Sequence, residues 1–182
     1  MREIADLLAP FGVEAVSAGK LGLPEPEETG DSFAENARLK AAAAARDVTA
    51  AGARRRFQAL RSRRLDGAPG IHSARWGGAD QETSGSPWSA CIASSKQPAA
   101  RTRSANFTCA LALAAPDGKS EVFEGKVFGT LTWPPRGARG FGYDPIFVPE
   151  GYKQTFGEME PSLKDSISHR ARAFRETDAG CL

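Results

Sequence analysis

FGYDP at residues 141–145 and SHR at residues 168–170 are the two stretches from which the rest of this sequence can be interpreted. The first closes a glycine-rich loop that begins at Trp133, and the second stands at the head of a C-terminal helical pattern. An aromatic face can stack on a flat ring, Arg and His can donate hydrogen bonds to its carbonyl edge, and a carboxylate can accept one from a ring N–H. Together the two stretches predict a pocket for a flat, hydrogen-bonding ring attached to an anionic group.

Each stretch also has an interpretation that needs no ligand. Gly and Asp-Pro favour turns, so residues 141–145 could be only a turn between strands. Ser168 could cap a helix, with His169 and Arg170 in its solvated first turn. The occurrence of both stretches in one chain favours the pocket.

Length and composition place the chain among compact globular domains. It has 182 residues, 41% of them hydrophobic, and a formal net charge of +2, so nothing global requires nucleic acid or a membrane. Cys91, Cys109 and Cys181 are sparse and unpatterned, which favours a reducing cytoplasm over a disulfide framework or a zinc site. Residues 1–16 include acids and no long apolar run, so they indicate neither a signal peptide nor a membrane span. The sequence thus predicts one cytoplasmic domain over residues 1–182.

Hydrophobic periodicity predicts both helices and strands, and therefore an α/β domain. The expected helices cover residues 2–9, 33–47, a short segment from 161, and 168 to about 177. The expected strands cover residues 13–16, 105–114, 121–131 and 145–148. A hairpin turn at Pro116-Asp117-Gly118 joins the two long strands.

Glu35 and Asn36 lie one turn into the expected helix over residues 33–47, with Lys40 near the same face. A carboxylate and an amide at this place can hold Mg²⁺ or a water molecule. The alternative is that Glu35 is a capping carboxylate that interacts with the helix dipole, and for an isolated motif this alternative is favoured.

Two stretches lack the composition and hydrophobic periodicity of folded protein. Residues 48–64 contain six arginines without helical or strand periodicity, and residues 80–103 are rich in Ser, Gln and Pro. Charged side chains cannot occupy a buried strand without partners, so we expect the arginine-rich run to loop out. A basic patch for nucleic acid is an alternative that the lack of interleaved aromatic residues disfavours. We therefore expect both segments to be aberrant or disordered.

The motifs as a set resemble the inosine triphosphate pyrophosphatase family, the dITP/XTP pyrophosphatases that remove noncanonical purine nucleotides. The matching segments lie in family order over most of the chain: ETG at 28–30, FAENA at 33–37, LDGAPGIHSAR at 65–75, FTCAL at 107–111, FGYDP at 141–145, and Lys164 with SHR at 168–170. The resemblance implies an elongated α/β domain with a long, curved mixed sheet, two lobes and a nucleotide cleft between them, usually in a homodimer. Enzymes of this family hydrolyse ITP, dITP and XTP to the monophosphate and pyrophosphate, with Mg²⁺ and an activated water.

The resemblance also implies roles for individual residues. Phe141 would stack on the base, while Asp144, His169 and Arg170 would read its edge. Lys164 would lie near the phosphates or the sugar, and Glu35 would bind Mg²⁺. The full set implied for substrate binding is Phe141, Gly142, Tyr143, Asp144, Lys164, His169 and Arg170. A 6-oxo purine accepts hydrogen bonds from Arg or His where the 6-amino group of adenine would oppose donor to donor, so adenine should be refused.

Two elements of the family pattern are missing. The phosphate-binding T-G-N-x-x-K segment is expected before Arg2. The acidic A-D-D-S-G turn, which carries the proton acceptor and a metal ligand, is expected just before Leu65. Arg55 and Arg56 stand near the place of the catalytic aspartate, so no catalytic residue is assigned.

A shift of reading frame explains both aberrant stretches. With suitable synonymous codons, residues 54–57 read one base later spell A-D-D and the start of S, and residues 58–64 read from the third base spell G-L-A-V-E-A. Residues 86–100 read in the same way spell A-M-E-R-V-H-R-E-L-E-A-A-G-G, an amphipathic helix. We infer that both runs are out-of-frame translations, from gene decay or from an error in the nucleotide sequence. The resemblance then implies a pyrophosphatase impaired in catalysis or, alternatively, a catalytically dead purine-nucleotide-binding protein.

Overall fold

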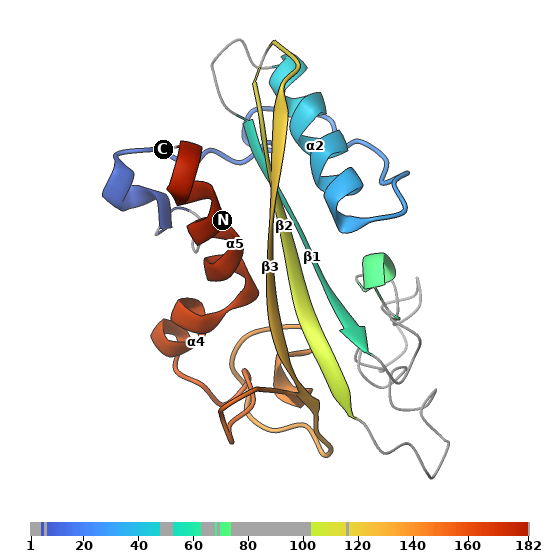
Figure 1. Cartoon of the computed structure of the whole chain (residues 1–182), viewed down its shortest axis with the longest axis vertical. Coiled ribbons are helices and arrows are strands. Elements are labelled where there is room, and N and C mark those ends of the chain that lie inside the picture. Colours follow the sequence, from blue (N-terminus) through green and yellow to red (C-terminus); the bar gives the residue numbers. More distant parts are fainter. Residues whose placement is uncertain are drawn as a thin grey trace. The chain divides into compact units, whose positions relative to one another are not determined.

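The chain folds into helices and strands that form two compact units. The computed structural model describes residues 5, 7–47, 53–62, 68, 70–73, 103–115 and 117–181. One unit comprises Met1–Phe57, Cys109–Gly125 and Arg170–Leu182, and the other comprises Gln58–Thr108 and Lys126–His169. In chain order the elements are η1 (Ala9–Phe11), α2 (Phe33–Asp47), β1 (Ala53–Ser62), η3 (Gly70–His72), β2 (Ser104–Ala114), β3 (Ser120–Leu131), η4 (Asp144–Ile146), β4 (Phe147–Pro149), α4 (Pro161–Ile167) and α5 (His169–Cys181) (Figure 1).

In the unit that contains α2, helices cover both faces of the strands, with α2 on one side and α5 on the other (Figure 1). The side chains that α2 buries are mostly small and recur at helical spacing: Phe33, Ala37, Ala41, Ala44 and Ala45. Alanines allow a helix to approach its neighbour closely, so beyond Phe33 this face packs through small apolar side chains. On the other side, one cluster joins α5 to β2 and the N-terminal segment: Leu8, Cys109, Leu111, Ala173 and Phe174.

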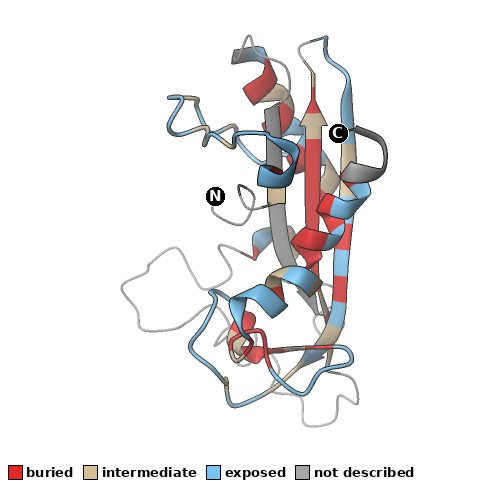
Figure 2. Cartoon of the chain, turned by 90° about the vertical axis from the view of Figure 1, so that its left-hand side faces the viewer, coloured by how far each residue is buried: buried red, intermediate tan, exposed pale blue. Residues whose placement is uncertain are grey.

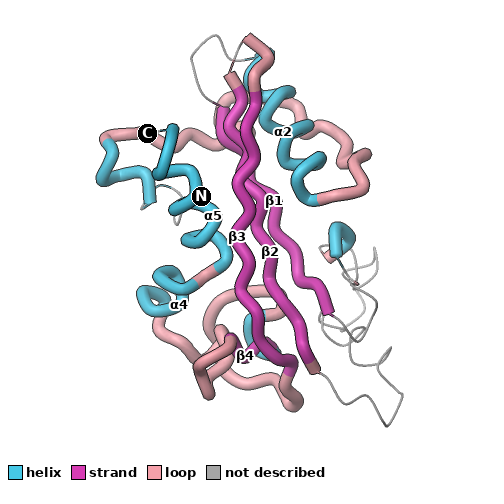
Figure 3. The backbone as a smooth tube through the Cα atoms, viewed as in Figure 1, coloured by secondary structure: helices cyan, strands magenta, loops and turns pink. Residues whose placement is uncertain are grey.

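The sheet has the strand order β1-β2-β3-β4 (Figure 3). β2 and β3 form the expected hairpin, because the N–H of Ala115 donates to the C=O of Lys119 at one end and that of Leu131 donates to Arg103 at the other. β4 pairs antiparallel with the end of β3, and Thr130 lies opposite Val148. This pairing brings the segment after residue 145 back beside the hairpin.

An aromatic core supports the unit that carries β4. Phe107 makes an edge-on contact with Phe147, with ring centroids 4.7 Å apart, and a tilted contact with Phe156 at 5.9 Å. Tyr143, Ile146 and Met159 are buried in the same cluster. Figure 2 shows that β2 is buried along most of its length, whereas exposed and buried positions alternate along part of β3. One side of β3 therefore contributes to the core and the other faces solvent.

Two expectations about secondary structure were wrong. Residues 53–62 do not loop out: they form β1, paired with β2. A strand ladder is made by backbone N–H and C=O groups, so an arginine-rich sequence can form one. Residues 13–16 form no strand.

Other expectations hold, or lie outside the described residues. α2 has the predicted bounds, and β2, β3, α4 and α5 begin within one residue of their predicted starts. β4 is shorter than predicted, because Pro145 belongs to the 3-10 turn η4. Of the segments expected to be aberrant, 48–52, 63–64 and 80–102 lie outside the described residues. In the helix expected over 2–9, residues 5, 7 and 8 are helical, and residues 2–4 and 6 lie outside the described residues. Within the described part of the chain, no helix is long and apolar enough to span a bilayer.

Candidate functional site

The turn at residues 141–144 presents one aromatic ring to solvent and buries the other. Phe141 is 58% exposed, whereas Tyr143 is 5% exposed. The glycines on either side of Phe141 have φ angles of 76° and 61°, in the left-handed region that favours glycine. The hydroxyl of Tyr143 donates to the C=O of Ser73 at 3.1 Å, which ties the turn to η3. The turn thus has one exposed ring and one ring that anchors it. The substrate-binding role expected of Gly142 and Tyr143 stays a prediction.

A buried ion pair lies directly beneath this turn. The Oδ2 atom of Asp144 accepts from the backbone N–H of Phe141 at 2.8 Å and from Nζ of Lys164 at 2.5 Å. The two charged side chains are only 5% and 8% exposed. The ammonium also lies 5.4 Å from the ring centroid of Phe141 and 5.7 Å from that of Phe156, within the range of cation–π attraction. One cation therefore fixes the acid, the backbone of the turn and its exposed ring.

Gly140 is required where the loop meets this ion pair. A Cβ atom at Gly140 would lie 2.9 Å from Cγ of Asp144 and 3.0 Å from Nζ of Lys164. Both distances are shorter than ordinary van der Waals contacts, and the ion pair between Asp144 and Lys164 prevents either side chain from moving away freely. A side chain here would push the acid and the lysine apart.

His169 and Arg170 are buried at the start of α5, where they are 1% and 2% exposed. The alternative of a solvated first helical turn is therefore wrong. The imidazole of His169 stacks on the ring of Phe107, with centroids 5.0 Å apart and an interplanar angle of 15°. Phe107 of β2 thus supports the histidine, a function that sequence reasoning missed; its place in the FTCAL motif at residues 107–111 was the available signal.

Glu35 is a capping carboxylate, as the alternative interpretation of the sequence held. Its Oε2 atom accepts from the backbone N–H groups of Asp31 at 2.9 Å and Ser32 at 3.1 Å, while the Ser32 hydroxyl accepts from the N–H of Glu35 at 3.1 Å. Asn36 completes this helix start, because its side-chain amide exchanges hydrogen bonds of 2.8 and 3.1 Å with the backbone of Gly30. The metal-binding role of Glu35 stays a prediction.

Lys40 anchors the loop that precedes α2. It is 8% exposed, its ammonium forms an ion pair with Glu28, and Glu25 lies 3.7 Å away. Sequence reasoning placed Lys40 near the face of Glu35 and did not predict this pairing. The acidic residues of the loop supplied the signal for it.

The arginines near the expected acidic turn belong to β1. Among the described residues, no group of three or more His, Cys, Asp or Glu side chains could hold a metal ion. Of the predicted site residues, Phe141, Asp144 and Lys164 are brought together in one unit with His169. Glu35 and Arg170 belong to the other unit. The described residues therefore bring most of the predicted site residues into one unit, and the binding roles of all of them stay predictions.

Known proteins match this chain in sequence and in structure over nearly its full length. The Ham1 family model matches residues 1–179. A curated relative from Zymomonas mobilis, a dITP/XTP pyrophosphatase, is 47% identical over 100% of this chain and 87% of its own length. A dITP/XTP pyrophosphatase from Caulobacter vibrioides is 52% identical over 97% of this chain and 90% of its own length. A HAM1 protein structure from Coxiella burnetii has a TM-score of 0.87 at 30% identity, covering 98% of this chain and 90% of that one.

Proposed function

The chain belongs to the Ham1 family, and from this premise we propose that it descends from a nucleoside-triphosphate pyrophosphatase for ITP, dITP and XTP. Such an enzyme hydrolyses the bond between the α- and β-phosphates and releases the nucleoside monophosphate and pyrophosphate. The observation that carries the proposal is the exposed ring of Phe141 held over the buried pair of Asp144 and Lys164. A rigid, exposed aromatic face beside buried polar groups is what a purine base requires.

The buried polar groups supply a reason for preferring 6-oxo purines. Arg170 carries only hydrogen-bond donors, and His169 donates from at least one ring nitrogen. Aimed at the edge of a base, such donors match the carbonyl of hypoxanthine or xanthine and oppose the amino group of adenine. Because both residues are buried, an opposed donor would have no water to satisfy it. Discrimination against adenine nucleotides follows.

The described residues do not by themselves form a Mg²⁺ site. They supply one carboxylate, Glu35, whose Oε2 atom already accepts two backbone hydrogen bonds. Mg²⁺ in nucleotide enzymes is commonly held by one or two carboxylates together with substrate phosphates and waters. Glu35 would therefore contribute to metal binding only with a nucleotide present, and we derive no catalytic step from it.

Loss of the acidic turn sets the expected activity. Residues 54–56 are all arginine, where the resemblance places the proton acceptor and a metal ligand. Without a base to activate water and without the second ligand, hydrolysis should be slower by orders of magnitude. The same observation favours the second candidate, a purine-nucleotide-binding protein without turnover, because the base-side residues are all present.

Calorimetric titration with IMP and ITP, with and without Mg²⁺, combined with a pyrophosphate-release assay, separates the candidates. Binding with turnover identifies an active enzyme, and binding without turnover identifies the second candidate. AMP is the matched control for the base. Failure to bind either inosine nucleotide would overturn both. A homodimer in the cytoplasm belongs to the same proposal, and light scattering of the purified chain tests the oligomeric state.

A further inference from the structure

We propose that Thr155 and Glu158 are positioning residues that hold the base-contacting loop, residues 133–144, in its binding shape. The inference rests on the proposed function, because that function assigns Phe141 and Asp144 to the purine. Neither Thr155 nor Glu158 belongs to the predicted substrate-binding set. Their role follows from the contacts that they make with the loop.

The hydroxyl of Thr155 connects two chain segments that are nineteen residues apart. It donates to the C=O of Arg136 at 2.8 Å and accepts from the N–H of Glu158 at 3.2 Å. In return, Oε2 of Glu158 accepts from the N–H of Thr155 at 2.8 Å. Thr155 is fully buried, so solvent cannot reach its hydroxyl in place of these partners. We call this arrangement of Thr155, Glu158 and the Arg136 carbonyl the clasp.

The backbone bonds around the clasp show how closely the two segments approach. The N–H of Arg139 donates to the C=O of Gly157 at 2.9 Å, and the N–H of Gly157 donates to the C=O of Asp144 at 3.0 Å. A Cβ atom on Gly157 would lie 2.8 Å from the carbonyl oxygen of Arg136 and 2.9 Å from Cα of Pro145. Gly157 therefore lies in close contact with both Arg136 and Pro145. Thr155 and Glu158 of the clasp flank it in the sequence and hold it in this position.

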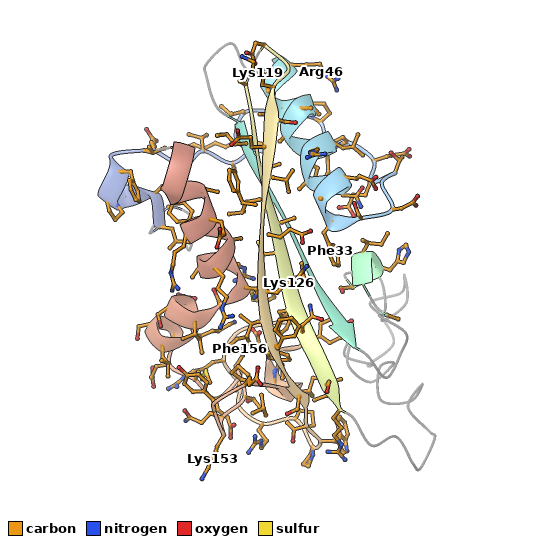
Figure 4. The ribbon with its side chains drawn as sticks, viewed as in Figure 1. Phe33, Arg46, Lys119, Lys126, Lys153 and Phe156 are labelled. Atoms are coloured by element: carbon orange, nitrogen blue, oxygen red, sulfur yellow. The ribbon has the colours of Figure 1, made fainter. Side chains whose placement is uncertain are left out.

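Two arginines of the loop reach back to the same segment. A guanidinium nitrogen of Arg136 donates to the C=O of Lys153 at 3.0 Å, and Nε lies 3.7 Å from the Glu158 carboxylate. Arg139 donates to the C=O of Glu158 at 3.2 Å and pairs with Glu160 at 2.7 Å. These side chains are more than one-third exposed, so the paired charges add little by themselves. In Figure 4, the side chain of Lys153 points outward, so only its backbone takes part.

The clasp matters for ligand binding because it gives the loop a second anchor, at Arg136, in addition to the Asp144–Lys164 pair that holds the turn at Phe141. The ring of Phe141 is mostly exposed, and glycines with positive φ precede and follow it. A loop that must be ordered by its ligand binds more weakly, since part of the interaction free energy offsets the lost conformational freedom. A loop ordered in advance by the clasp avoids that cost. Removing the clasp should therefore reduce affinity for the base while the fold persists.

Thr155→Val tests this, with Thr155→Ser as its matched control. Valine keeps the branched shape and loses the hydroxyl, whereas serine keeps the hydroxyl that donates to Arg136. Hydrogen exchange of residues 136–144 is measured in the ligand-free protein, and IMP affinity by calorimetry. For Thr155→Val we expect exchange in this loop to accelerate and IMP affinity to fall by about tenfold, because the Arg136 carbonyl loses its part-buried donor. Thr155→Ser should resemble the unaltered chain in both measurements.

The two measurements separate this inference from the proposed function. If the unaltered chain does not bind IMP, the proposed function fails, while hydrogen exchange still tests the clasp. If Thr155→Val leaves loop exchange unchanged, or loosens the loop without lowering IMP affinity, the positioning role is refuted. Should Thr155→Val fail to fold, Glu158→Ala decides the matter on the same two measurements. Its control is Glu158→Gln, which keeps an oxygen to accept from the Thr155 N–H.

Discussion

Replacing Lys164 with methionine should destabilise the protein strongly, because it leaves the Asp144 carboxylate buried without its cation. The two side chains are 8% and 5% exposed and their charged atoms are 2.5 Å apart, so solvent cannot take the place of the lysine. Breaking such a pair from one side costs about 3–5 kcal/mol. In a chain of this size each kcal/mol lowers Tm by about 2–4 °C. We therefore expect Tm to fall by about 6–20 °C, since methionine fills a similar volume and adds little cavity.

A double-mutant cycle measured by urea denaturation isolates the ion pair from this packing change. Asp144→Asn keeps an oxygen that can accept from the Phe141 N–H, and combined with Lys164→Met it removes both charges. The double variant should be more stable than Lys164→Met alone, with a coupling free energy of about 2 kcal/mol or more. A loss below about 1 kcal/mol for Lys164→Met is what an exposed pair gives. That result, or strict additivity in the cycle, would refute the buried pair as the support of the turn.

Three further substitutions and one sequencing experiment test other parts of the reasoning. Phe141→Ala should weaken IMP binding by roughly tenfold to a hundredfold, since stacking on a base contributes about 1–3 kcal/mol, and Tm should hardly change because the ring is exposed; unchanged calorimetric affinity would contradict the stacking role. Gly140→Ala should lower both Tm and IMP affinity, because its Cβ would meet the Asp144 carboxylate at a φ of 76°, and an unaffected thermal transition would count against this. Glu35→Ala should lower the free energy of unfolding by about 0.5–2 kcal/mol in urea and Glu35→Gln by less, and equal losses would argue against the cap. Translation of the DNA across codons 48–103 in shifted reading frames should give the A-D-D-S and A-M-E-R sequences, and their absence would disprove the frame-shift hypothesis.

The sequence was sufficient to predict the elements whose patterns are local. The helix over residues 33–47 has a cap sequence and a helical row of alanines, and the hairpin has a Pro-Asp-Gly turn between two runs of β-forming residues. Each of these signals lies within the element that it specifies. The family motifs added the order of the site residues along the chain.

The errors and omissions have a different origin, because they concern contacts between residues that lie far apart in the sequence. Nothing in the composition of residues 53–62 showed that β2 would accept them as a neighbouring strand. The stacking of His169 on Phe107 joins residues from opposite ends of the second half of the chain, and no periodicity encodes it. The ion pair of Lys164 with Asp144 was not predicted either, because it depends on the approach of α4 to the turn. The place of Lys164 near the phosphates or the sugar stays a prediction. Contacts of this kind are decided by packing between elements.

The proposed function, in which a base site is kept without the acidic turn, has a specific kinetic consequence. Contacts to the purine lie away from the bond between the α- and β-phosphates, so they bind the substrate and the transition state about equally. Only interactions that strengthen in the transition state accelerate hydrolysis, and the base and metal ligand that the resemblance assigns to the acidic turn would be of that kind. Phe141, Asp144 and Lys164 are linked to one another directly, and the Tyr143 hydroxyl ties their turn to Ser73. None of these residues belongs to the arginine-rich run. Nucleotide affinity and turnover can therefore separate in this chain, because the side chains that would support each come from different segments.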